Sequence, residues 1–441
     1  MLRMKRLIFN LKINLMRRIA RTHFKRVCVN ETKSLEQLLA EQELAKRELV
    51  SYAFQNIPFY QQHYRAVGFE LGDMEQANWF EKLPILTKEH LRNQFEDFTP
   101  QHLKRFRKIS TTGGSTGVPT KCGYDGRIPE EVYSWRLQSW YGVNPWDDHA
   151  YIWRDTRTTK IAKLKNKLLW WPTTHLKLDA SFITEEAIVE FLKAFNRVKP
   201  TLLQGYVGAV CQVAQYVLEH RIQLHVPKFV WVTAAPLSPV QRKLLEEAFH
   251  APVCDQYGSC EVRWIAQQCP QSAGLHVNID HVCLEYVDEN NCVVPIGEYG
   301  KTLLTNLEDR VFPMIRYENG DRGRWLNQTC PCGCALPLID SVKGRESESF
   351  VLPSGKTING EYLTTFFDGN PDVVRGFRVI QHKDLSITVE YIPAQEGIES
   401  ILQQIEADFR QRLDNEVELS FVVRNEIPHD RGKLRFVVRE K

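Results

Sequence analysis

The sequence predicts an α/β protein with a β-rich part and a separate small α+β domain at its C-terminal end. Between about residues 149 and 260, short apolar runs alternate with amphipathic stretches, which is typical of parallel strands joined by helices. After Gly274 the runs become shorter and are separated by Gly and Asn turns, which favours a β-rich subdomain. From residue 344 onward, two alternating strand patterns flank one helical pattern and indicate a compact unit of its own.

Composition excludes several classes of protein. A chain of 441 residues is long enough for two or three domains of about 100–200 residues each. With 43% hydrophobic residues it is neither disordered nor fibrous, and a net charge of +3 argues against a dedicated nucleic-acid binder. The 11 cysteines are odd in number and irregularly spaced, so we expect a reduced, cytoplasmic protein with some cysteines on a metal, not a disulfide framework.

The first 27 residues contain nine Lys or Arg and no acidic residue. Their apolar residues recur at helical spacing: Met4, Ile8, Leu11, Leu15 and Ile19. This pattern predicts a basic amphipathic helix that lies on anionic lipid, at the inner membrane surface. Basic residues interrupt every apolar run, so neither a signal-peptide core nor a spanning helix fits. The alternative is an extra helix that packs on the body of the protein.

The elements can be predicted in order along the rest of the chain. Helical spacing favours a helix over residues 35–55 that ends before Pro58. In the α/β part we expect strands at 150–153, 201–205 and 229–233 and helices at 185–198, 208–220 and 239–249. In the β-rich part we expect strands at 281–287, 300–305 and 314–317. The C-terminal domain is predicted as a strand at 386–392, a helix at 398–413 and a strand at 418–424.

A glycine-rich loop covers residues 110–121, where six hydroxyl side chains, three glycines and a lysine follow one another. Glycines let successive backbone N–H groups turn toward one centre, and the hydroxyls and the lysine add donors, which suits a polyphosphate. The loop lacks the Gly-Lys-Ser/Thr ending of a Walker loop. A linker of the same composition is the alternative interpretation.

A cysteine cluster, Cys330-Pro331-Cys332-Gly333-Cys334, indicates a metal site. Three thiols this close suit structural Zn²⁺, which thiolates bind tetrahedrally. We expect Cys330 and Cys332 as two ligands and Cys269 and His276 as the other two, with Cys254 and Cys334 in reserve. The alternative is a set of reduced, buried cysteines without metal.

Five segments in order resemble the motifs of adenylate-forming enzymes, the superfamily of acyl-CoA synthetases, peptide-synthetase adenylation domains and luciferases. They are the phosphate loop at 112–120, a Tyr-Gly-x-x-Glu segment ending at Glu261, a Tyr-x-x-Gly-Asp segment ending at Asp321, a hinge at 343–348 and a C-terminal Gly-Lys ending at Lys433. Ile57–Tyr60, Gly205-Tyr206 and Cys330–Gly333 are similar to the phenylacetate–CoA ligase branch, which includes ligase-like proteins linked to capsular polysaccharide biosynthesis and members with a zinc site. The resemblance extends from about residue 35 to 441.

The resemblance implies ATP, Mg²⁺ and CoA as cofactors and a role for each matching residue. Lys433 and Glu261 would be catalytic: Lys433 bridges acyl carboxylate and phosphate, and Glu261 holds Mg²⁺. The phosphates would meet Ser115, Thr116, Gly117 and Lys121. The nucleoside would meet Tyr257 by stacking, Asp321 at the ribose, and Ala234, Gly258 and Arg345 around them. The expected acyl pocket consists of Trp140, Tyr141, Trp153, Tyr206 and Ala235.

We therefore expect a cytoplasmic, AMP-forming ligase that activates a carboxylate as acyl-adenylate and transfers the acyl group to CoA. Transfer to an amine, in surface or capsular polysaccharide modification, is the alternative. A non-catalytic, membrane-associated partner is a third hypothesis, which the presence of Lys433, Glu261 and Asp321 disfavours. The predicted domains are a basic arm (1–30), an adenylation body (31–343) and a mobile C-terminal lid (344–441).

Two departures from the family pattern bear on the site. Ala234-Ala235-Pro236 stands where many relatives have Gly-Glu-Pro, and Glu348 where a hinge aspartate is common. The segment Thr156–Lys177, rich in Lys, Arg, Trp and Thr, has no counterpart that we identify in the family. We expect a solvated face there; contact with CoA phosphates or with an anionic sugar is the alternative.

Overall fold

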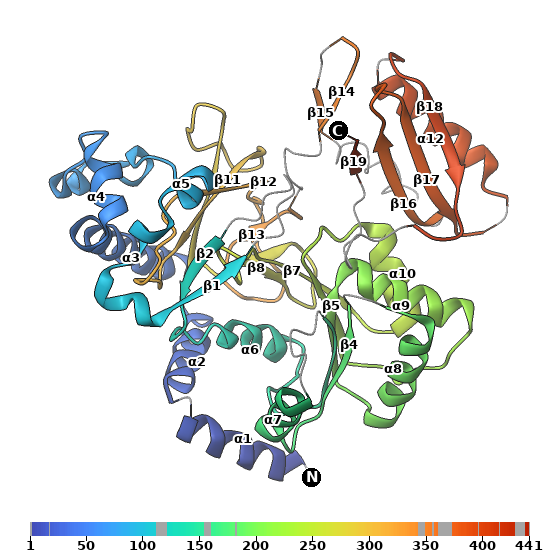
Figure 1. Cartoon of the computed structure of the whole chain (residues 1–441), viewed down its shortest axis with the longest axis horizontal. Helices are drawn as coiled ribbons and strands as arrows, with labels where there is room; N and C mark the ends of the chain where they lie inside the picture. The colour runs from blue at the N-terminus through green and yellow to red at the C-terminus, as the bar shows by residue number, and fades with distance from the viewer. Residues whose placement is uncertain are drawn as a thin grey trace. The chain divides into compact units, whose positions relative to one another are not determined.

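The chain forms two compact units in a computed structural model, which Figure 1 shows as a cartoon. Unit 1 contains Met1–Lys5, Trp146–Asp255 and Gly344–Lys441, and unit 2 contains Arg6–Pro145 and Gln256–Lys343. The structure describes residues 2–16, 18–111, 121–153, 160–180, 183–342, 349–354, 357–359, 373–395, 397–413, 415–427 and 437–440. The division passes through the first helix and through strand β7, so each unit is assembled from separate pieces of sequence.

Unit 1 contains a parallel sheet whose strands alternate with helices along the chain. The strand order is β4-β3-β5-β6, and β3 pairs in parallel with β4 and β5, as β5 does with β6. The elements are β3 (His149–Trp153), α7 (Lys160–Trp170), β4 (His175–Asp179), α8 (Glu185–Val198), β5 (Leu202–Tyr206), α9 (Val207–Glu219), β6 (Phe229–Thr233) and α10 (Pro239–Phe249). The predicted α/β class is confirmed, and β4 and α7 are elements that the sequence patterns did not predict.

Local sequence explains these boundaries. All residues of β6 are buried, which is why that strand is a continuous apolar run and not an alternating one. Helix α8 begins at Thr184, whose side chain accepts the backbone N–H of Ala187, and ends at Lys199 in the left-handed conformation (φ 55°). At the turn from β5 to α9, a Cβ on Gly205 would lie 2.4 Å from the Val210 side chain, so the turn requires glycine.

The C-terminal part of unit 1 is the small α+β domain that the sequence predicts. Its sheet has the order β18-β17-β16-β19, with an antiparallel centre and parallel outer pairs. Ile405 and Phe409 of the helix are buried in one hydrophobic cluster with the strands. The elements are β14 (Ser349–Val351), β15 (Thr357–Asn359), β16 (Val374–Gln381), β17 (Ile387–Pro393), α12 (Glu399–Arg412), β18 (Leu419–Val423) and β19 (Val437–Arg439).

Unit 2 begins with helices and a hairpin. They are α1 (Leu2–Met16, whose first residues belong to unit 1), α2 (Arg18–Asn30), α3 (Leu35–Asn56), α4 (Pro58–Arg65), α5 (Lys88–Asn93), β1 (Arg107–Thr111), β2 (Lys121–Asp125) and α6 (Glu131–Trp140). Short 3-10 turns connect α4, α5 and β1. Helix α3 starts at a capping box on Ser34 and stops before Pro58, as predicted.

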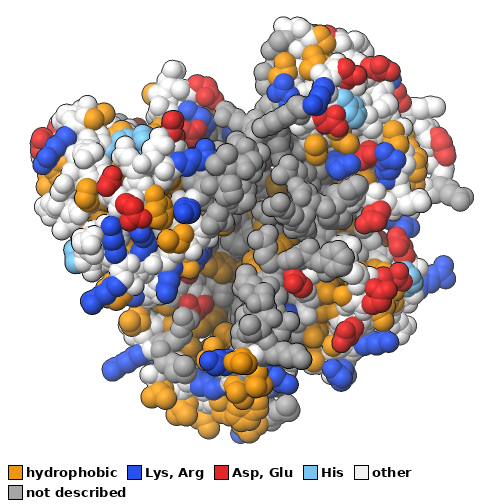
Figure 2. Space-filling view, viewed as in Figure 1, with side chains coloured by type: hydrophobic (Ala, Val, Ile, Leu, Met, Phe, Trp, Pro, Cys, Tyr) orange, Lys and Arg blue, Asp and Glu red, His pale blue; other side chains and the backbone are white. Residues whose placement is uncertain are grey.

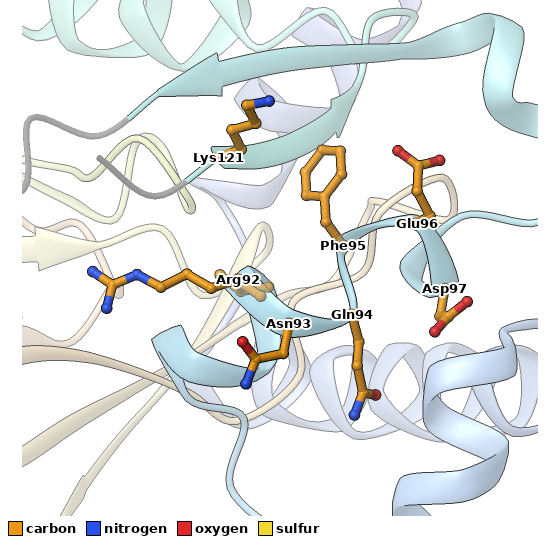
Figure 3. A pocket seen from close by; sticks show the side chains of 8 residues that line it. Arg92, Asn93, Gln94, Phe95, Glu96, Asp97 and Lys121 are labelled. Carbon is orange, nitrogen blue, oxygen red and sulfur yellow. The ribbon is translucent and has the colours of Figure 1, made fainter. Parts of the chain in front are cut away.

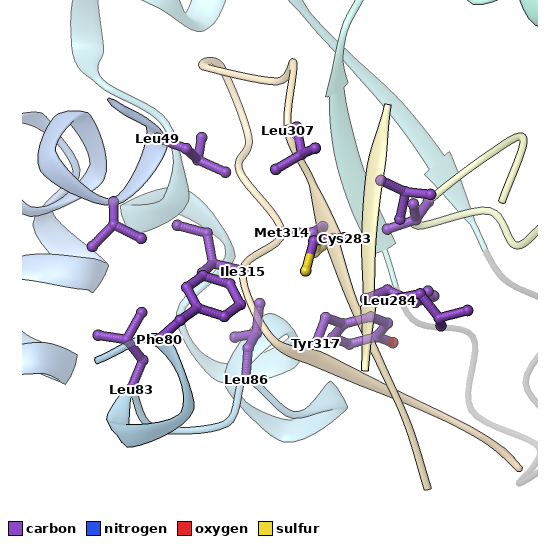
Figure 4. Close-up of a cluster of buried hydrophobic side chains, with 14 of the residues drawn as sticks. Leu49, Phe80, Leu83, Leu86, Cys283, Leu284, Leu307, Met314, Ile315 and Tyr317 are labelled. Carbon is purple, nitrogen blue, oxygen red and sulfur yellow. The ribbon is translucent and has the colours of Figure 1, made fainter. Parts of the chain in front are cut away.

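Two antiparallel sheets complete unit 2. One has the order β10-β11-β12, and the other runs from the end of β7 through β8 and β9 to β13. The strands are β7 (Val253–Tyr257), β8 (Ala266–Gln268), β9 (Leu275–Val277), β10 (Val282–Val287), β11 (Gly300–Asn306), β12 (Tyr317–Gly323) and β13 (Leu338–Ile339). Figure 4 shows part of the core of this unit, where Phe80, Leu83 and Leu86 lie near Ile315.

The strand predicted at 314–317 is wrong, because β12 begins only at Tyr317. Met314 and Ile315 lie in the loop before it and are almost fully buried. The Met314 carbonyl accepts the backbone N–H of Asn306. These residues are apolar because they fill the core, while the strand itself carries polar residues, as the site below requires.

The N-terminal residues form two helices, and the second packs on the body. Ala20 and Val27 of α2 are buried with Trp135 of α6. Arg136 on α6 is fully buried and donates to the Val27 carbonyl and to both carboxylate oxygens of Asp280. For α2, the alternative of an extra helix packed on the protein is therefore the observed one.

Helix α1 differs, because Leu7, Leu11 and Leu15 are 67–85% exposed on it. Within the described residues, no helix has both the length and the hydropathy needed to cross a membrane. The predicted division into residues 1–30, 31–343 and 344–441 stays a prediction, and the two compact units divide the chain differently.

Candidate active site

A hydrogen-bonded network joins the end of β7 to β12 in unit 2. The Tyr257 hydroxyl donates to Asp321 Oδ2 at 2.8 Å. Asn319 Nδ2 donates to the same Oδ2 at 2.6 Å and to the Tyr257 hydroxyl oxygen at 2.7 Å, and its Oδ1 accepts the backbone N–H of Asp321. Lys88 on α5 donates to the Asn319 carbonyl at 2.8 Å. The network holds the Asp321 carboxylate beside the Tyr257 ring, as the predicted nucleoside contacts of these two residues need.

Strand geometry explains why these residues meet. Tyr317 and Asn319 are two residues apart on β12, and the strand is irregular after Asn319, where Gly320 has a φ of 85° and the Asp321 N–H turns back to Asn319 Oδ1. Burial, and then the negative charge of Asp321, raise the pKa of Tyr257 well above its ordinary value, so the phenol keeps its proton and donates. Gly258 follows Tyr257. A Cβ at this position would lie 2.8 Å from Gln256 Nε2, so a larger residue would crowd the Gln256 side chain. Sequence reasoning selected Tyr257 and Asp321 but missed Asn319, which the two-residue spacing within the motif could have indicated.

Glu261 is buried next to this network. The hydroxyl of Tyr317 donates to Glu261 Oε1 at 3.0 Å, and Glu261 is 5% exposed. The thiol of Cys122, on β2, donates to the backbone carbonyl of Cys260 at 3.4 Å. The strand that follows the glycine-rich loop therefore contacts the segment that carries Glu261. A single carboxylate held in this way fits Mg²⁺, a hard cation that takes carboxylate and phosphate oxygens.

Lys121, the first residue of β2, lies on a cavity of about 510 Å³ (Figure 3). Residues 91–97, from α5 onward, line the rest of it and include the cation Arg92. On the same wall, Glu96 accepts two hydrogen bonds from Arg107 and is thereby neutralised. Arg92 and Lys121 are the two cations among the described residues on this cavity, whose wall also includes Asp97, and Arg92 is a residue that the sequence patterns did not single out.

Several predicted site residues lie outside the described residues. They are Ser115, Thr116 and Gly117 of the loop, Arg345 of the hinge and Lys433 of the C-terminal domain. Their roles stay predictions.

In unit 1, predicted pocket residues follow the carboxyl ends of neighbouring parallel strands. Tyr206 ends β5 and packs on Trp153, which ends β3, with ring centroids 4.3 Å apart. Ala234 and Ala235 follow β6, and Ala234 has a positive φ of 73°. Ligands of parallel α/β sheets bind beyond these strand ends. The aromatic pair with small residues beside it is consistent with an acyl pocket, which remains a prediction.

Trp140 and Tyr141 occupy a different place, at the end of α6 in unit 2. The Trp140 ring lies edge-on to the His276 ring at 5.4 Å, and its indole N–H donates to Glu31. The Tyr141 hydroxyl donates to the Gln268 carbonyl. Both side chains therefore contact the surroundings of the cysteine cluster, and their predicted role in the acyl pocket stays a prediction.

The structure brings together the four predicted metal ligands. One ligand atom from each of Cys269, His276, Cys330 and Cys332 lies within 4.8 Å of all the others. The Cys269 and Cys330 sulfurs are 3.4 Å apart, and Cys332 Sγ lies 3.4 Å from His276 Nε2. Three sulfurs and one imidazole nitrogen at this separation suit tetrahedral Zn²⁺.

The surroundings of the cluster prepare these groups to bind a metal. His276 Nδ1 lies 2.9 Å from the Leu336 carbonyl and donates to it, which leaves Nε2 with its lone pair toward the sulfurs. Burial lowers the pKa of His276, so the imidazole is neutral, as a metal ligand must be. Gly333, with a φ of 82°, makes the turn between Cys332 and Cys334, and the Cys334 N–H points at the Cys332 sulfur. The reserve ligands Cys254 and Cys334 are not in the four-residue cluster.

Comparisons with known proteins define the class of fold. Residues 350–440 match the model of the CapK C-terminal domain. A crystal structure of 2-hydroxyisobutyryl-CoA ligase in the postadenylation state superposes with a TM-score of 0.76 at 19% identity, over 93% of this chain and 91% of that one. Amide bond synthetase McbA from Marinactinospora thermotolerans superposes with a TM-score of 0.52 at 16% identity, over 75% and 67%. The chain has the fold of adenylate-forming ligases, and its residues 350–440 are similar to the CapK C-terminal domain.

Among curated proteins, CapK of Staphylococcus aureus is 24% identical over 410 residues, which cover 89% of this chain and 87% of that protein. Phenylacetate-coenzyme A ligase of Escherichia coli K12 is 22% identical over 354 residues, covering 73% and 74%. The resemblance to the phenylacetate–CoA ligase branch and its capsule-linked relatives is therefore confirmed.

Proposed function

We propose that the chain is an ATP-dependent, AMP-forming ligase that activates a carboxylate as acyl-adenylate and transfers the acyl group to CoA. The observation that carries the proposal is that Tyr257 and Asp321 are hydrogen-bonded to each other with Glu261 buried next to them, on a fold shared with CoA ligases. The ring of Tyr257 stacks on adenine, and Asp321 accepts from the ribose hydroxyls. Tyr317 keeps Glu261 oriented toward the phosphates.

The proposed reaction has two steps, adenylation of the carboxylate and transfer of the acyl group to CoA. A carboxylate oxygen attacks the α-phosphorus of ATP, the bond to the β-phosphate breaks and pyrophosphate leaves. The CoA thiol then attacks the acyl carbonyl, AMP leaves with the electron pair of the broken bond, and the thiol proton passes to solvent. Glu261 would hold Mg²⁺, and such an ion would supply positive charge against the negative charge that develops in the first step.

Hydrogen-bond donors and cations of this chain would also stabilise the negative charge of the triphosphate. Lys121 and Arg92 lie beside the end of the glycine-rich loop, where the triphosphate binds. Ser115, Thr116 and Gly117 supply loop contacts, Arg345 contacts ribose or phosphate, and Lys433 bridges the acyl carboxylate and the α-phosphate during adenylation. In unit 1, Ala234, Ala235, Tyr206 and Trp153 bound the acyl group.

Transfer to an amine, giving an amide, is the second candidate, in surface or capsular polysaccharide modification. Two findings favour it: the match of residues 350–440 to the CapK C-terminal domain and the fold shared with an amide bond synthetase. Both candidates form the same acyl-adenylate in the first step. They differ in the second step, in which the acceptor is either the CoA thiol or an amine.

A structural Zn²⁺ belongs to the proposed enzyme. Cys269, His276, Cys330 and Cys332 would hold it, and it would join β9 to the turn before β13 without taking part in the reaction. The low exposure of Cys269, His276 and Cys330 and the single ring lone pair directed at the sulfurs support this assignment.

The proposed location is cytoplasmic, with peripheral contact at the inner membrane surface through residues 1–27. On α1, Leu7, Leu11 and Leu15 recur at a spacing of four and are mostly exposed, and residues 1–27 contain nine Lys or Arg and no acidic residue. A helix of this kind lies in the lipid interface.

Product analysis tests the proposal and separates the two acceptors. The purified chain is incubated with ATP, Mg²⁺ and one carboxylate at a time, with CoA or an amine, and AMP, thioester and amide are measured by mass spectrometry. Acid-dependent AMP together with a CoA thioester is the expected result. AMP and an amide without thioester would establish the second candidate, and no acid-dependent AMP would contradict both.

A further inference from the structure

Helix α7 presents an apolar side to solvent. Ile161, Leu164 and Leu168 are 68%, 58% and 64% exposed, and their spacing places them on one side of the helix. Leu169 and Trp171 continue the apolar surface, at 49% and 58% exposed. In Figure 2, hydrophobic side chains gather with basic ones where Figure 1 draws α7. Large apolar side chains this exposed and this close together mark an interaction surface.

The charged residues of α7 itself and of its nearest sequence neighbours are all basic. Residues 156–178 contain six Lys or Arg and no Asp or Glu. Four of the six, Lys160, Lys163, Lys165 and Lys167, lie within the helix itself. A basic helix with an exposed Leu, Ile and Trp face has the composition of helices that lie in the interface of a membrane rich in anionic lipid. Each basic residue near such a surface strengthens binding severalfold.

We propose that α7 is a lipid-docking helix that binds the surface of an anionic membrane through Ile161, Leu164 and Leu168. Charge complementarity decides between lipid and other occupants. A second copy of the chain would set one all-positive helix against another, and like charges across an interface oppose association. A polyphosphate ligand such as CoA would use the lysines but leaves the apolar side without a partner.

The structure fixes α7 at its C-terminal end. The Thr173 hydroxyl donates to the Trp146 carbonyl at 3.1 Å, and the Thr174 N–H donates to Asp148 Oδ1 at 2.7 Å. The same carboxylate accepts the buried ammonium of Lys5 at 2.6 Å. Asp148 therefore ties the first turn of α1 and the chain after α7 to one point of unit 1. Docking of α7 thus acts on the folded unit and not on a free tail.

Vesicle co-sedimentation of the full chain tests the proposal. The chain is mixed with vesicles of phosphatidylcholine alone or with phosphatidylglycerol added, and bound protein is measured at low and high salt. The double variant L164E/L168E should bind the anionic vesicles at least about tenfold more weakly than the wild type. The variant V226E, which alters an exposed valine elsewhere in unit 1, is the matched control and should bind like the wild type.

The vesicle experiment has separate results for and against lipid docking by α7. Anionic-lipid binding that L164E/L168E weakens and salt reduces supports the proposal. Equal binding by L164E/L168E and the wild type, or no binding of the wild type, overturns it. A wild-type dimer that the double variant dissociates in sedimentation velocity also overturns it, because the face would then be a contact between copies. If the double variant does not fold, L164S/L168S replaces it. The inference does not rest on the ligase activity, since ATP–pyrophosphate exchange without vesicles should be the same in both variants.

Discussion

Replacing Asn319 with alanine should weaken the use of ATP in addition to destabilising the fold. The Asn319 side chain is almost fully buried and makes three hydrogen bonds, to the Tyr257 hydroxyl, to Asp321 Oδ2 and from the Asp321 N–H. A hydrogen bond to a charged group contributes about 1.5–3 kcal/mol, and an unmade buried one costs a similar amount. If about half of the hydrogen bond's contribution, about 0.75–1.5 kcal/mol, orients the Asp321 carboxylate toward ribose, the KM for ATP should rise about four- to twelvefold.

The assay is ATP–pyrophosphate exchange with ATP and with 2′-deoxy-ATP. In the wild type, removing a ribose hydroxyl should raise KM because Asp321 loses a donor, whereas in Asn319→Ala the two nucleotides should become nearly equal. Asn306→Ala is the matched control: it removes a buried asparagine of the same unit whose Oδ1 accepts the Glu308 N–H and which does not contact Tyr257 or Asp321. A folded Asn319→Ala variant with wild-type KM and wild-type discrimination would refute the assignment.

Three further predictions follow from buried groups of unit 2. Cys330→Ser should lower bound zinc, measured by mass spectrometry on chelator-free protein, from about one equivalent toward zero. Arg136→Met should destabilise the chain by about 3–5 kcal/mol in urea unfolding, because it leaves the Asp280 carboxylate buried without its cation. Burial lowers the pKa of His281, but the hydrogen bond and charge of Glu308 outweigh this and hold that pKa above 6.5. The stability that Glu308→Gln removes should therefore be largest below pH 6.5 and shrink as the pH rises through the raised pKa of His281, in urea midpoints measured across that range.

Controls separate these effects from general damage. Cys292→Ser changes an exposed cysteine and should leave zinc unchanged. Arg322→Met removes a surface ion pair with Glu289 and should cost at most about 1 kcal/mol. The Glu308 carboxylate has its own pKa held low, so its stabilisation is lost only as the pH falls below the ordinary value of 4.5. A zinc-loaded Cys330→Ser, an unaffected Arg136→Met or a pH-independent gap for Glu308→Gln would each contradict the corresponding prediction.

Much of the fold could be predicted because its elements have simple patterns. Helix α10 and strand β6 have the predicted bounds, since a capping box on Ser238 and a fully buried apolar run are local signals. The strand at 314–317 could not be placed correctly, because apolar Met314 and Ile315 fill the core from a loop and the true strand is polar. The polar character of β12 follows from its place in the site, which a periodicity of two does not reveal.

In the candidate site, too, residues that are close in sequence could be predicted, whereas residues brought together only by folding could not. Cys330 and Cys332 are neighbours in sequence, and their spacing alone predicted half of the metal cluster. Asn319 lay inside a motif already identified, but its contact with Tyr257 spans 62 residues of sequence and depends on the pairing of strands. Arg92 reaches the cavity beside Lys121 from a short helix with no motif. Residues of this kind can be found only in the folded chain.

ATP–pyrophosphate exchange by the full chain, over a panel of aromatic, aliphatic, amino and sugar carboxylates, tests most directly whether this protein forms acyl-adenylates. At least one acid should stimulate exchange well above the acid-free rate, and Lys433→Ala should abolish that exchange while still forming thioester from a supplied acyl-adenylate and CoA. Folded, zinc-loaded protein that exchanges with no acid, or a Lys433→Ala variant that exchanges like the wild type, would contradict the proposed function or the role of Lys433, respectively.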